Sequence, residues 1–169
     1  SLHDALPISL RQAESALTDA RNRAAMLHDM QRDFEGFSRS VKSVMQQASR
    51  GGRSGVHGPV SALLSTENRF VTAIDTALGA SASSIVVGSA EDGRACIEYL
   101  RRTDGGRATF LPLDTIRPAS LRESGLDRER GCCGTADTLV QFDETYGAVV
   151  RSLLARTVVC ENMDAALAL

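Results

Sequence analysis

Aromatic residues are scarce in this 169-residue sequence, which has no tryptophan, two tyrosines and five phenylalanines. Hydrophobic residues nevertheless make up 43% of the chain, so we expect a sizeable core built mainly from aliphatic side chains. No apolar run is long enough to cross a bilayer, and no signal peptide is evident. With a formal net charge of only −2, the chain is not a polycation that binds nucleic acid along its whole length.

Cysteine is also infrequent, and the four cysteines have the spacing of neither a zinc site nor a redox motif. They are Cys96, Cys132, Cys133 and Cys160. The neighbouring Cys132 and Cys133 could close a strained vicinal disulfide, but two free thiols are the favoured interpretation. These features predict reduced thiols, a cytoplasmic protein, no membrane partner and no metal site.

Lysine is almost absent, because Lys42 is the only lysine among 19 basic residues. Arginine favours forked contacts with phosphate, although genome base composition produces the same bias and is the favoured explanation here. The candidates for DNA contact are Arg39, Lys42, Arg50, Arg53, Arg101, Arg102 and Arg107. A solvated surface is the commoner role of such residues, and a patch that contacts phosphate groups is the alternative.

Residues 10–50 have apolar side chains at alternating steps of three and four, which is the pattern of a coiled-coil seam. The principal seam residues are Leu10, Leu17, Ala24, Leu27, Phe34, Phe37, Val41 and Val44. The pattern predicts one long helix, from Leu10 to Ala48, that forms half of a coiled-coil arm. Residues 1–9 include Pro7 and do not continue this pattern, so we expect a non-native extension there.

An internal repeat is the most informative feature of the sequence. Residues 55–64 recur 76 positions later as residues 131–140, and after a four-residue deletion residues 85–87 match residues 157–159. The repeat predicts a mixed α+β fold in which two similar lobes are related by a pseudo-twofold axis. We expect lobe I at residues 51–116, a polar linker at 117–130, and lobe II at 131–169.

Within each lobe, the pattern of apolar residues predicts alternating strands and helices. Helices are expected at residues 67–78, 91–102, 146–154 and 163–169, and strands at residues 84–87, 107–111 and 157–160, with a short strand or turn at 60–64. Lobe II has no counterpart of the strand at residues 107–111, so we expect the sequence to be a fragment of a longer protein.

No cluster of catalytic residues is apparent. The pairs Gly55/Gly58 and Gly131/Gly134 lack the following Lys-Ser/Thr of a phosphate-binding P-loop, and unusual backbone geometry is their more common role. His57 beside Cys132 or Cys133 is the one arrangement that suggests a nucleophile or a metal ligand, and no spacing supports it. We therefore predict no catalytic and no metal-binding residues, and an enzyme is the least favoured function.

Several segments, taken in order, resemble the hinge domain of the SMC family, the structural-maintenance-of-chromosomes ATPases, especially its bacterial members. The most specific is Gly-Arg-Ala-Thr-Phe-Leu-Pro-Leu-Asp at residues 106–114. It is accompanied by the segments at residues 35–44, 55–58, 73–79, 84–87 and 156–159. The resemblance covers residues 10–169.

The resemblance implies that two such hinges form a homodimer, joining two coiled-coil arms into a V or a ring that organises DNA during chromosome condensation and segregation. It assigns the hinge and dimerisation motif to Gly55, Gly58, Gly79, Gly131 and Gly134. Each arm would pair with a returning arm that is absent here. ATP and magnesium would bind to heads outside this chain, which itself would hold no cofactor.

The resemblance also implies DNA and accessory kleisin-type subunits as partners, and a location on the chromosome or nucleoid. The alternative function is a nucleic-acid-binding module that contacts single strands without sequence specificity.

Overall fold

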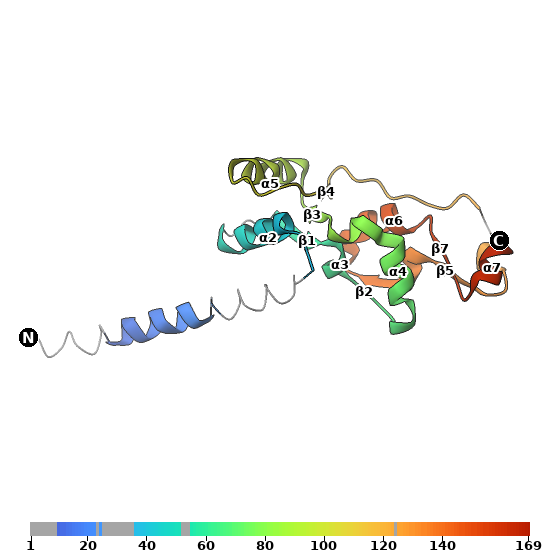
Figure 1. Ribbon diagram of the computed structural model, residues 1–169, viewed down its shortest axis with the longest axis horizontal. Coiled ribbons are helices and arrows are strands. Elements are labelled where there is room, and N and C mark those ends of the chain that lie inside the picture. Colours follow the sequence, from blue (N-terminus) through green and yellow to red (C-terminus); the bar gives the residue numbers. More distant parts are fainter. Residues whose placement is uncertain (1–9, 23, 25–35, 52–54, 124) are drawn as a thin grey trace, which may run out of the picture. The chain divides into compact units, whose positions relative to one another are not determined.

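The computed structural model describes residues 10–22, 24, 36–51, 55–123 and 125–169 (Figure 1). Predictions for residues 1–9 and for Leu27, Phe34 and Arg53 therefore lie outside the described residues. Two units are present, one that precedes Ser38 and one that comprises Ser38–Leu169. No helix among the described residues has both the length and the apolar character needed to cross a membrane.

In the first unit, residues 10–22 and Ala24 are helical. Leu10 and Leu17 are 62% and 53% exposed, so these two predicted seam residues are not buried by the described residues. The uninterrupted helix that we predicted from Leu10 to Ala48 is wrong at residues 36–38, which are not helical. Gly36 has a φ of 116°, in the left-handed region that ends helices.

A new helix, α2 (Arg39–Gly51), begins directly after this break. The Ser38 hydroxyl accepts a hydrogen bond from the Val41 amide at 3.4 Å, which caps the helix start. Val41 and Val44 are 2% and 0% exposed, because α2 packs against β1 (Val56–Pro59) and α5 (Ala90–Arg102). These two predicted seam residues thus belong to the core of the second unit, which begins at Ser38.

Lobe I contains a three-stranded sheet in the order β1-β3-β4. β1 runs antiparallel to β3 (Ile85–Val87), and β3 runs parallel to β4 (Phe110–Pro112). The helices of this lobe are α3 (Val60–Leu63), α4 (Val71–Leu78) and α5, with 3-10 turns at Asn68–Phe70 and Gly79–Ser83. The Asp92 amide donates to the Ser89 hydroxyl at 3.1 Å and so caps α5.

Lobe II contains the antiparallel pair β5 (Cys132–Thr135) and β7 (Val158–Cys160). Its helices are α6 (Gly147–Leu154) and α7 (Met163–Leu167), and its 3-10 turns are Ala136–Leu139 and Glu144–Tyr146. A further 3-10 turn, Leu126–Arg128, lies in the linker. Between the lobes, residues 113–123 form an irregular segment (Figure 1). The short strand or turn predicted at residues 60–64 is wrong, because residues 60–63 form the helix α3 and only Leu64 belongs to a strand. The other predicted helices and strands of the two lobes lie within a few residues of their observed positions, and the mixed α+β architecture is confirmed.

Equivalent backbone hydrogen bonds recur in the two lobes. The Val60 amide donates to the Ser84 carbonyl at 2.9 Å, and the Ala136 amide donates to the Thr157 carbonyl at 2.8 Å. Residues 60 and 136 differ by 76 positions, whereas residues 84 and 157 differ by 73. The deletion between the copies is therefore three residues, and the predicted four-residue deletion is wrong. In a sequence alignment, a short run of β-branched residues can be shifted by one position and still match similar residues. The backbone hydrogen bonds of the structure determine the correct register.

The two lobes meet through β2 (Leu64–Thr66) and β6 (Val140–Phe142), which form an antiparallel pair of their own. Ser65 lies opposite Gln141, and these two residues are equivalent in the repeat. Exchanging the two strands reproduces the same pairing, so a pseudo-twofold axis passes between Ser65 and Gln141. α4 packs against α6, its equivalent in the repeat.

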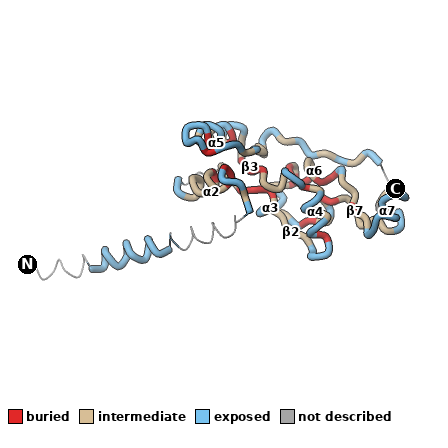
Figure 2. Tube along the Cα trace, viewed as in Figure 1, coloured by how far each residue is buried: buried red, intermediate tan, exposed pale blue. Residues whose placement is uncertain are grey.

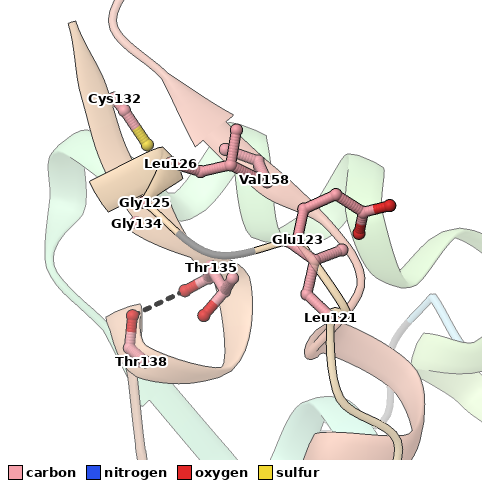
Figure 3. Close-up of a pocket in the computed structure, with 9 residues that line it drawn as sticks. All are labelled: Leu121, Glu123, Gly125, Leu126, Cys132, Gly134, Thr135, Thr138 and Val158. Carbon is pink, nitrogen blue, oxygen red and sulfur yellow. Dashed lines mark hydrogen bonds between the residues drawn. The ribbon is translucent and has the colours of Figure 1, made fainter. Parts of the chain in front are cut away.

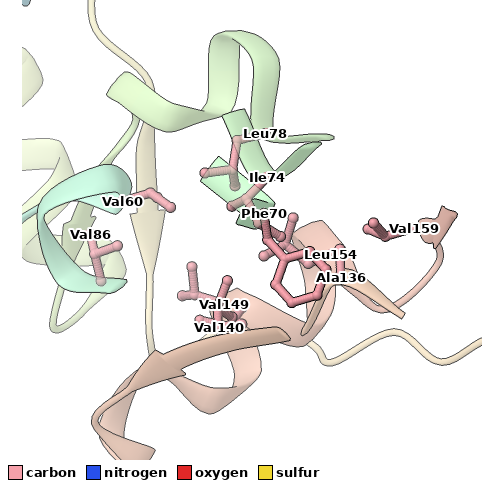
Figure 4. Close-up of a cluster of buried hydrophobic side chains, with 11 residues drawn as sticks. Val60, Phe70, Ile74, Leu78, Val86, Ala136, Val140, Val149, Leu154 and Val159 are labelled. Atoms are coloured by element: carbon pink, nitrogen blue, oxygen red, sulfur yellow. The ribbon is translucent and has the colours of Figure 1, made fainter. Parts of the chain in front are cut away.

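One hydrophobic core is shared by both lobes (Figure 4). Its buried members are Val60, Phe70, Ile74, Leu78 and Val86 from lobe I, and Ala136, Val140, Val149, Val150, Leu154 and Val159 from lobe II. Phe70 is the only aromatic side chain in this set, in keeping with the aliphatic core that the composition predicts. Buried positions concentrate in β3 and along α6 (Figure 2).

Because α2 is buried against β1 and α5, we predict that it unfolds together with the globular unit. We expect Val44→Ala to lower the free energy of unfolding by about 2 kcal/mol, because it removes two buried methyl groups and leaves a cavity. Val71→Ala is the matched control, since Val71 is 41% exposed and its truncation should cost under about 0.5 kcal/mol. Urea denaturation of both variants measures the difference, and equal midpoints would place α2 outside the cooperative unit.

Candidate functional site

The predicted hinge glycines have backbone conformations that side-chain-bearing residues rarely adopt. Gly58, Gly79, Gly131 and Gly134 have φ angles of 137°, 52°, 83° and 119°. Gly58 and Gly134 stand at equivalent irregularities in the two lobes, where the β1–β3 and β5–β7 registers shift by one residue. These β-bulges bend each first strand at the same place and so give the lobes the same shape.

Gly55 is required for a different reason, which is the close approach of a helix. A Cβ atom at Gly55 would clash with the carboxyl group of Asp92 near the start of α5. The same contact recurs in lobe II, where a Cβ atom at Gly131 would lie 2.7 Å from Ala165 Cβ in α7. Glycine thus allows α5, which follows β3, and α7, which follows β7, to pack directly on the backbone just before β1 and β5.

A polar contact joins the lobes beside the core. His57 Nδ1 in β1 and the Tyr146 hydroxyl form a hydrogen bond of 3.0 Å, and the two rings meet edge to face with centroids 5.4 Å apart. His57 therefore faces a tyrosine of the opposite lobe. Within the described part of the chain, no group of three or more histidine, cysteine or acidic residues is arranged to hold a metal ion.

The sheet edges are the next candidate for interaction. β4 pairs only with β3 among the described strands, so its other edge has no partner strand there. Phe110, Leu111 and Pro112 are half-buried, and Thr109, which precedes them, is exposed. An edge strand of this kind carries backbone N–H and C=O groups that a strand from a second molecule can pair with.

The predicted DNA-contact residues lie mainly on α2 and α5, which pack against each other (Figure 1). Arg39 and Arg50 are exposed on α2, where Lys42 is half-buried, and Arg101 and Arg102 are exposed in the last turn of α5. The structure therefore brings five of the seven candidates onto two adjoining helices.

Arg107 lies beside the start of α2, where its carbonyl accepts a hydrogen bond from the Ser40 hydroxyl at 2.6 Å. Arg107 also lines a cavity of about 420 Å³, together with Ser38, Ser83 and Thr109. Hydroxyl groups next to a guanidinium are suitable donors for a phosphate group.

A second cavity, of about 350 Å³, lies in lobe II between the linker and the β5–β7 pair (Figure 3). It is lined by Leu121, Glu123, Gly125, Leu126, Cys132, Gly134, Thr135, Thr138 and Val158. In lobe I the equivalent surface is covered by α2, where the Met45 methyl group lies 3.9 Å from a Cβ atom built on Gly58. The linker covers β5 less completely than α2 covers β1, which leaves the cavity.

The cysteines of lobe II are arranged in a way that their sequence spacing did not predict. Cys132 in β5 lies opposite Cys160 in β7, whereas Cys133 packs against the hydrophobic core. Burial, and then the neighbouring Cys132 and Cys133, raise the pKa of the Cys160 thiol. Cys132 and Cys160 are 28 positions apart, so only the strand register could have identified this pair.

Comparison with known proteins gives a consistent family. Residues 53–169 match the model of the SMC proteins flexible hinge domain. The chain is 39% identical over 161 residues to the chromosome partition protein Smc of Bacillus subtilis, covering 94% of this chain and 13% of that protein. It is 30% identical to the corresponding protein of Halothermothrix orenii, covering 85% of this chain and 12% of that one. The chain thus spans a small part of these relatives.

Solved structures that resemble the chain include two hinge domains. A crystal structure described as an asymmetric dimer of the Geobacillus stearothermophilus SMC hinge domain is 37% identical, with a TM-score of 0.77, and covers 98% of this chain and 65% of that one. The Pyrococcus furiosus SMC hinge domain is 27% identical, with a TM-score of 0.64, and covers 83% of this chain and 72% of that one.

The positive φ of Gly58 can be tested separately from side-chain packing. Gly58→Ala should lower the free energy of unfolding by about 1–3 kcal/mol, because alanine is strained at a φ of 137°. Gly93→Ala, within α5, is the control. A Cβ atom at Gly93 would lie at ordinary contact distances of 3.5 Å from Val87 and 3.6 Å from Phe110. It should stabilise the helix by about 0.5–1 kcal/mol. Thermal unfolding of both variants checks this, and a neutral Gly58→Ala would contradict it.

Proposed function

Because the chain belongs to the SMC family, and residues 53–169 correspond to its flexible hinge domain, we propose that it is the module through which two coiled-coil arms dimerise. The observation that carries the proposal is the likeness, at a TM-score of 0.77, to a hinge domain whose crystal structure is described as an asymmetric dimer. The glycines at equivalent bends support it, because they give the two lobes matching strand geometry.

The unpaired edge of β4 is the surface that we assign to the dimer contact. It would pair with lobe II of a second molecule, which adds hydrogen bonds between backbones to the burial of half-exposed aliphatic side chains. A twofold axis between the molecules would create the same contact twice, and two such contacts close the assembly without further growth. The glycines Gly55, Gly58, Gly79, Gly131 and Gly134 would shape the strands and turns that make these contacts.

The exposed seam of residues 10–22 supports the rest of the assignment. Leu10 and Leu17 would be covered by the returning arm of the same protein. In the complete protein, heads outside this chain would bind ATP and magnesium, and kleisin-type subunits and DNA would be partners on the chromosome or nucleoid of the cytoplasm. The hinge itself would contribute assembly and no chemistry.

Dimerisation can be tested with a chain extended through the remainder of the hinge and the returning arm. We expect sedimentation velocity to give a dimer that persists at about 1 M salt, since strand pairing and apolar burial are little affected by screening. Thr109→Lys should weaken the dimer by about tenfold, because a lysine beside an edge strand opposes pairing.

Thr72→Lys, on the exposed surface of α4, is the matched control and should leave the dimer unchanged. A wild-type monomer at micromolar concentration would overturn the proposal. Equal effects of the two lysines would remove β4 from the interface without deciding whether the protein dimerises elsewhere.

Single-stranded nucleic acid is the second candidate partner, and the adjoining basic residues of α2 and α5 favour it. These cations would contact phosphates and therefore bind without sequence specificity. Dimerisation remains the better supported function, because it accounts for the whole fold, whereas the basic residues account for one surface.

The second candidate predicts a specific dependence on salt. Replacing Arg101 and Arg102 together by glutamine should reduce the slope of log affinity against log salt by roughly 1.4, or about 0.7 for each lost phosphate contact. The linker pair Arg117 and Arg122, which is also exposed, provides a control double variant with the same change of charge. Fluorescence anisotropy with a single-stranded oligonucleotide measures both slopes, and identical slopes would exclude a localised patch.

A further inference from the structure

Cys132 and Cys160 are opposite each other on two antiparallel strands. The Glu161 amide donates to the Gly131 carbonyl at 2.9 Å, on the outer side of this pair. A hydrogen bond in this position is that of a non-hydrogen-bonded pair, in which Cα atoms of a regular ladder are typically ~4.5 Å apart, and the β-bulge of β5 begins only after Cys132. A disulfide needs Cα atoms roughly 4.4–6.8 Å apart, so the strand register already holds the two residues in range.

The two thiols also lie on the same face of the strands. Val159 is 7% exposed and belongs to the shared core, so its neighbours Val158 and Cys160 face the opposite side. On that side, Cys132 and Val158 line the cavity beneath the linker (Figure 3). Opposed residues in a strand pair project from the same face, which places the Cys160 side chain beside that of Cys132.

Both cysteines are half-exposed, whereas Cys96 is buried. The cavity of about 350 Å³ on which Cys132 opens gives a small molecule access to the pair. If the outer edge of β7 pairs with another strand, that contact uses the backbone and leaves the side chains free, since they project from the face of the sheet.

Lobe I has no counterpart of this pair. The equivalent strand positions there are occupied by Val56 and Val87, which also lie opposite each other. The same backbone geometry therefore carries two valines in one lobe and two thiols in the other. Valine at these positions would be sufficient for hydrophobic packing in both lobes. The thiols therefore give lobe II a capacity for redox chemistry that the valines of lobe I lack.

We propose that Cys132 and Cys160 are a redox-modification site, at which exchange with a low-molecular-weight disulfide forms a reversible cross-strand disulfide between β5 and β7. One protein thiolate attacks a sulfur of the small disulfide, which forms a mixed disulfide and releases one small thiol. The second protein thiol loses its proton to water and displaces the other small thiol.

In this exchange two protein thiols are oxidised to one protein disulfide, and one small disulfide is reduced to two small thiols. Excess small thiol reverses the reaction. Transient disulfides of this type occur in proteins whose thiols are otherwise kept reduced.

The disulfide would stabilise lobe II by restricting its unfolded chain. The closed loop runs from β5 to β7 and includes β6 and α6, which contribute Val140, Val149 and Leu154 to the shared core. Cross-linking a loop of this length raises stability mainly by lowering the entropy of the unfolded state. Because the core is shared, lobe I gains from the same restraint.

The experiment uses the whole 169-residue chain and oxidised glutathione as the probe. After oxidation and alkylation of the remaining thiols, mass spectrometry of proteolytic peptides should show a Cys132–Cys160 link. Thermal unfolding should shift upward by on the order of 10 °C, and dithiothreitol should reverse the shift.

Cys132→Val and Cys160→Val copy the residues of lobe I, so both variants should fold, form no link and show no shift. Cys133→Ala and Cys96→Ala should retain both the link and the shift. A Cys132–Cys133 or Cys133–Cys160 link, or a glutathione adduct that never resolves, would overturn the proposal. So would a persistent pair of free thiols at a glutathione ratio that oxidises an exposed cross-strand cysteine pair in a reference protein.

Discussion

Antiparallel pairing of β2 with β6 at a pseudo-twofold axis is the constraint on which the rest of the fold depends. It sets the lobes in an arrangement where α4 meets α6 and one aliphatic core serves both. Phe70, Ile74 and Leu78 are buried against side chains of lobe II, so neither lobe encloses a complete core alone. A small lobe would bury too little apolar surface to offset its conformational entropy, and sharing the core resolves that difficulty.

The two copies of the repeat differ in sequence at the contact between the lobes and on the surfaces that α2 and the linker cover. His57 corresponds to Cys133 in the repeat, and Tyr146 corresponds to Phe70, so the hydrogen bond between His57 and Tyr146 can form on one side of the axis only. α2 covers β1, whereas the linker covers β5 and leaves a cavity. The shared backbone geometry therefore supports different surface chemistry in each lobe.

Much of this arrangement could be predicted from the sequence, because the repeat places glycines and β-branched runs at matching positions. The predicted register between the copies is wrong by one residue, since residue type alone allows Ile85–Val87 to be aligned from either Thr157 or Val158. The predicted seam includes Val41 and Val44, which are buried in the globular unit, because spacing of three and four residues is shared by a coiled-coil seam and by a helix packed on a globular core. The pairing of Cys132 with Cys160 could not be predicted from the sequence, because it depends on the register between β5 and β7.

The pseudo-twofold axis within one chain has a mechanical consequence for the proposed dimer. Four lobes would alternate around the closed assembly, joined by seams of two kinds. The seams within each molecule carry the β2–β6 pair and the common core, so they part only when the lobes unfold. In the proposed dimer, the contacts between molecules would involve edge strands alone, so they could open while every lobe stays folded. Force transmitted along the arms would therefore separate the two contacts between molecules before it separates the lobes within either molecule.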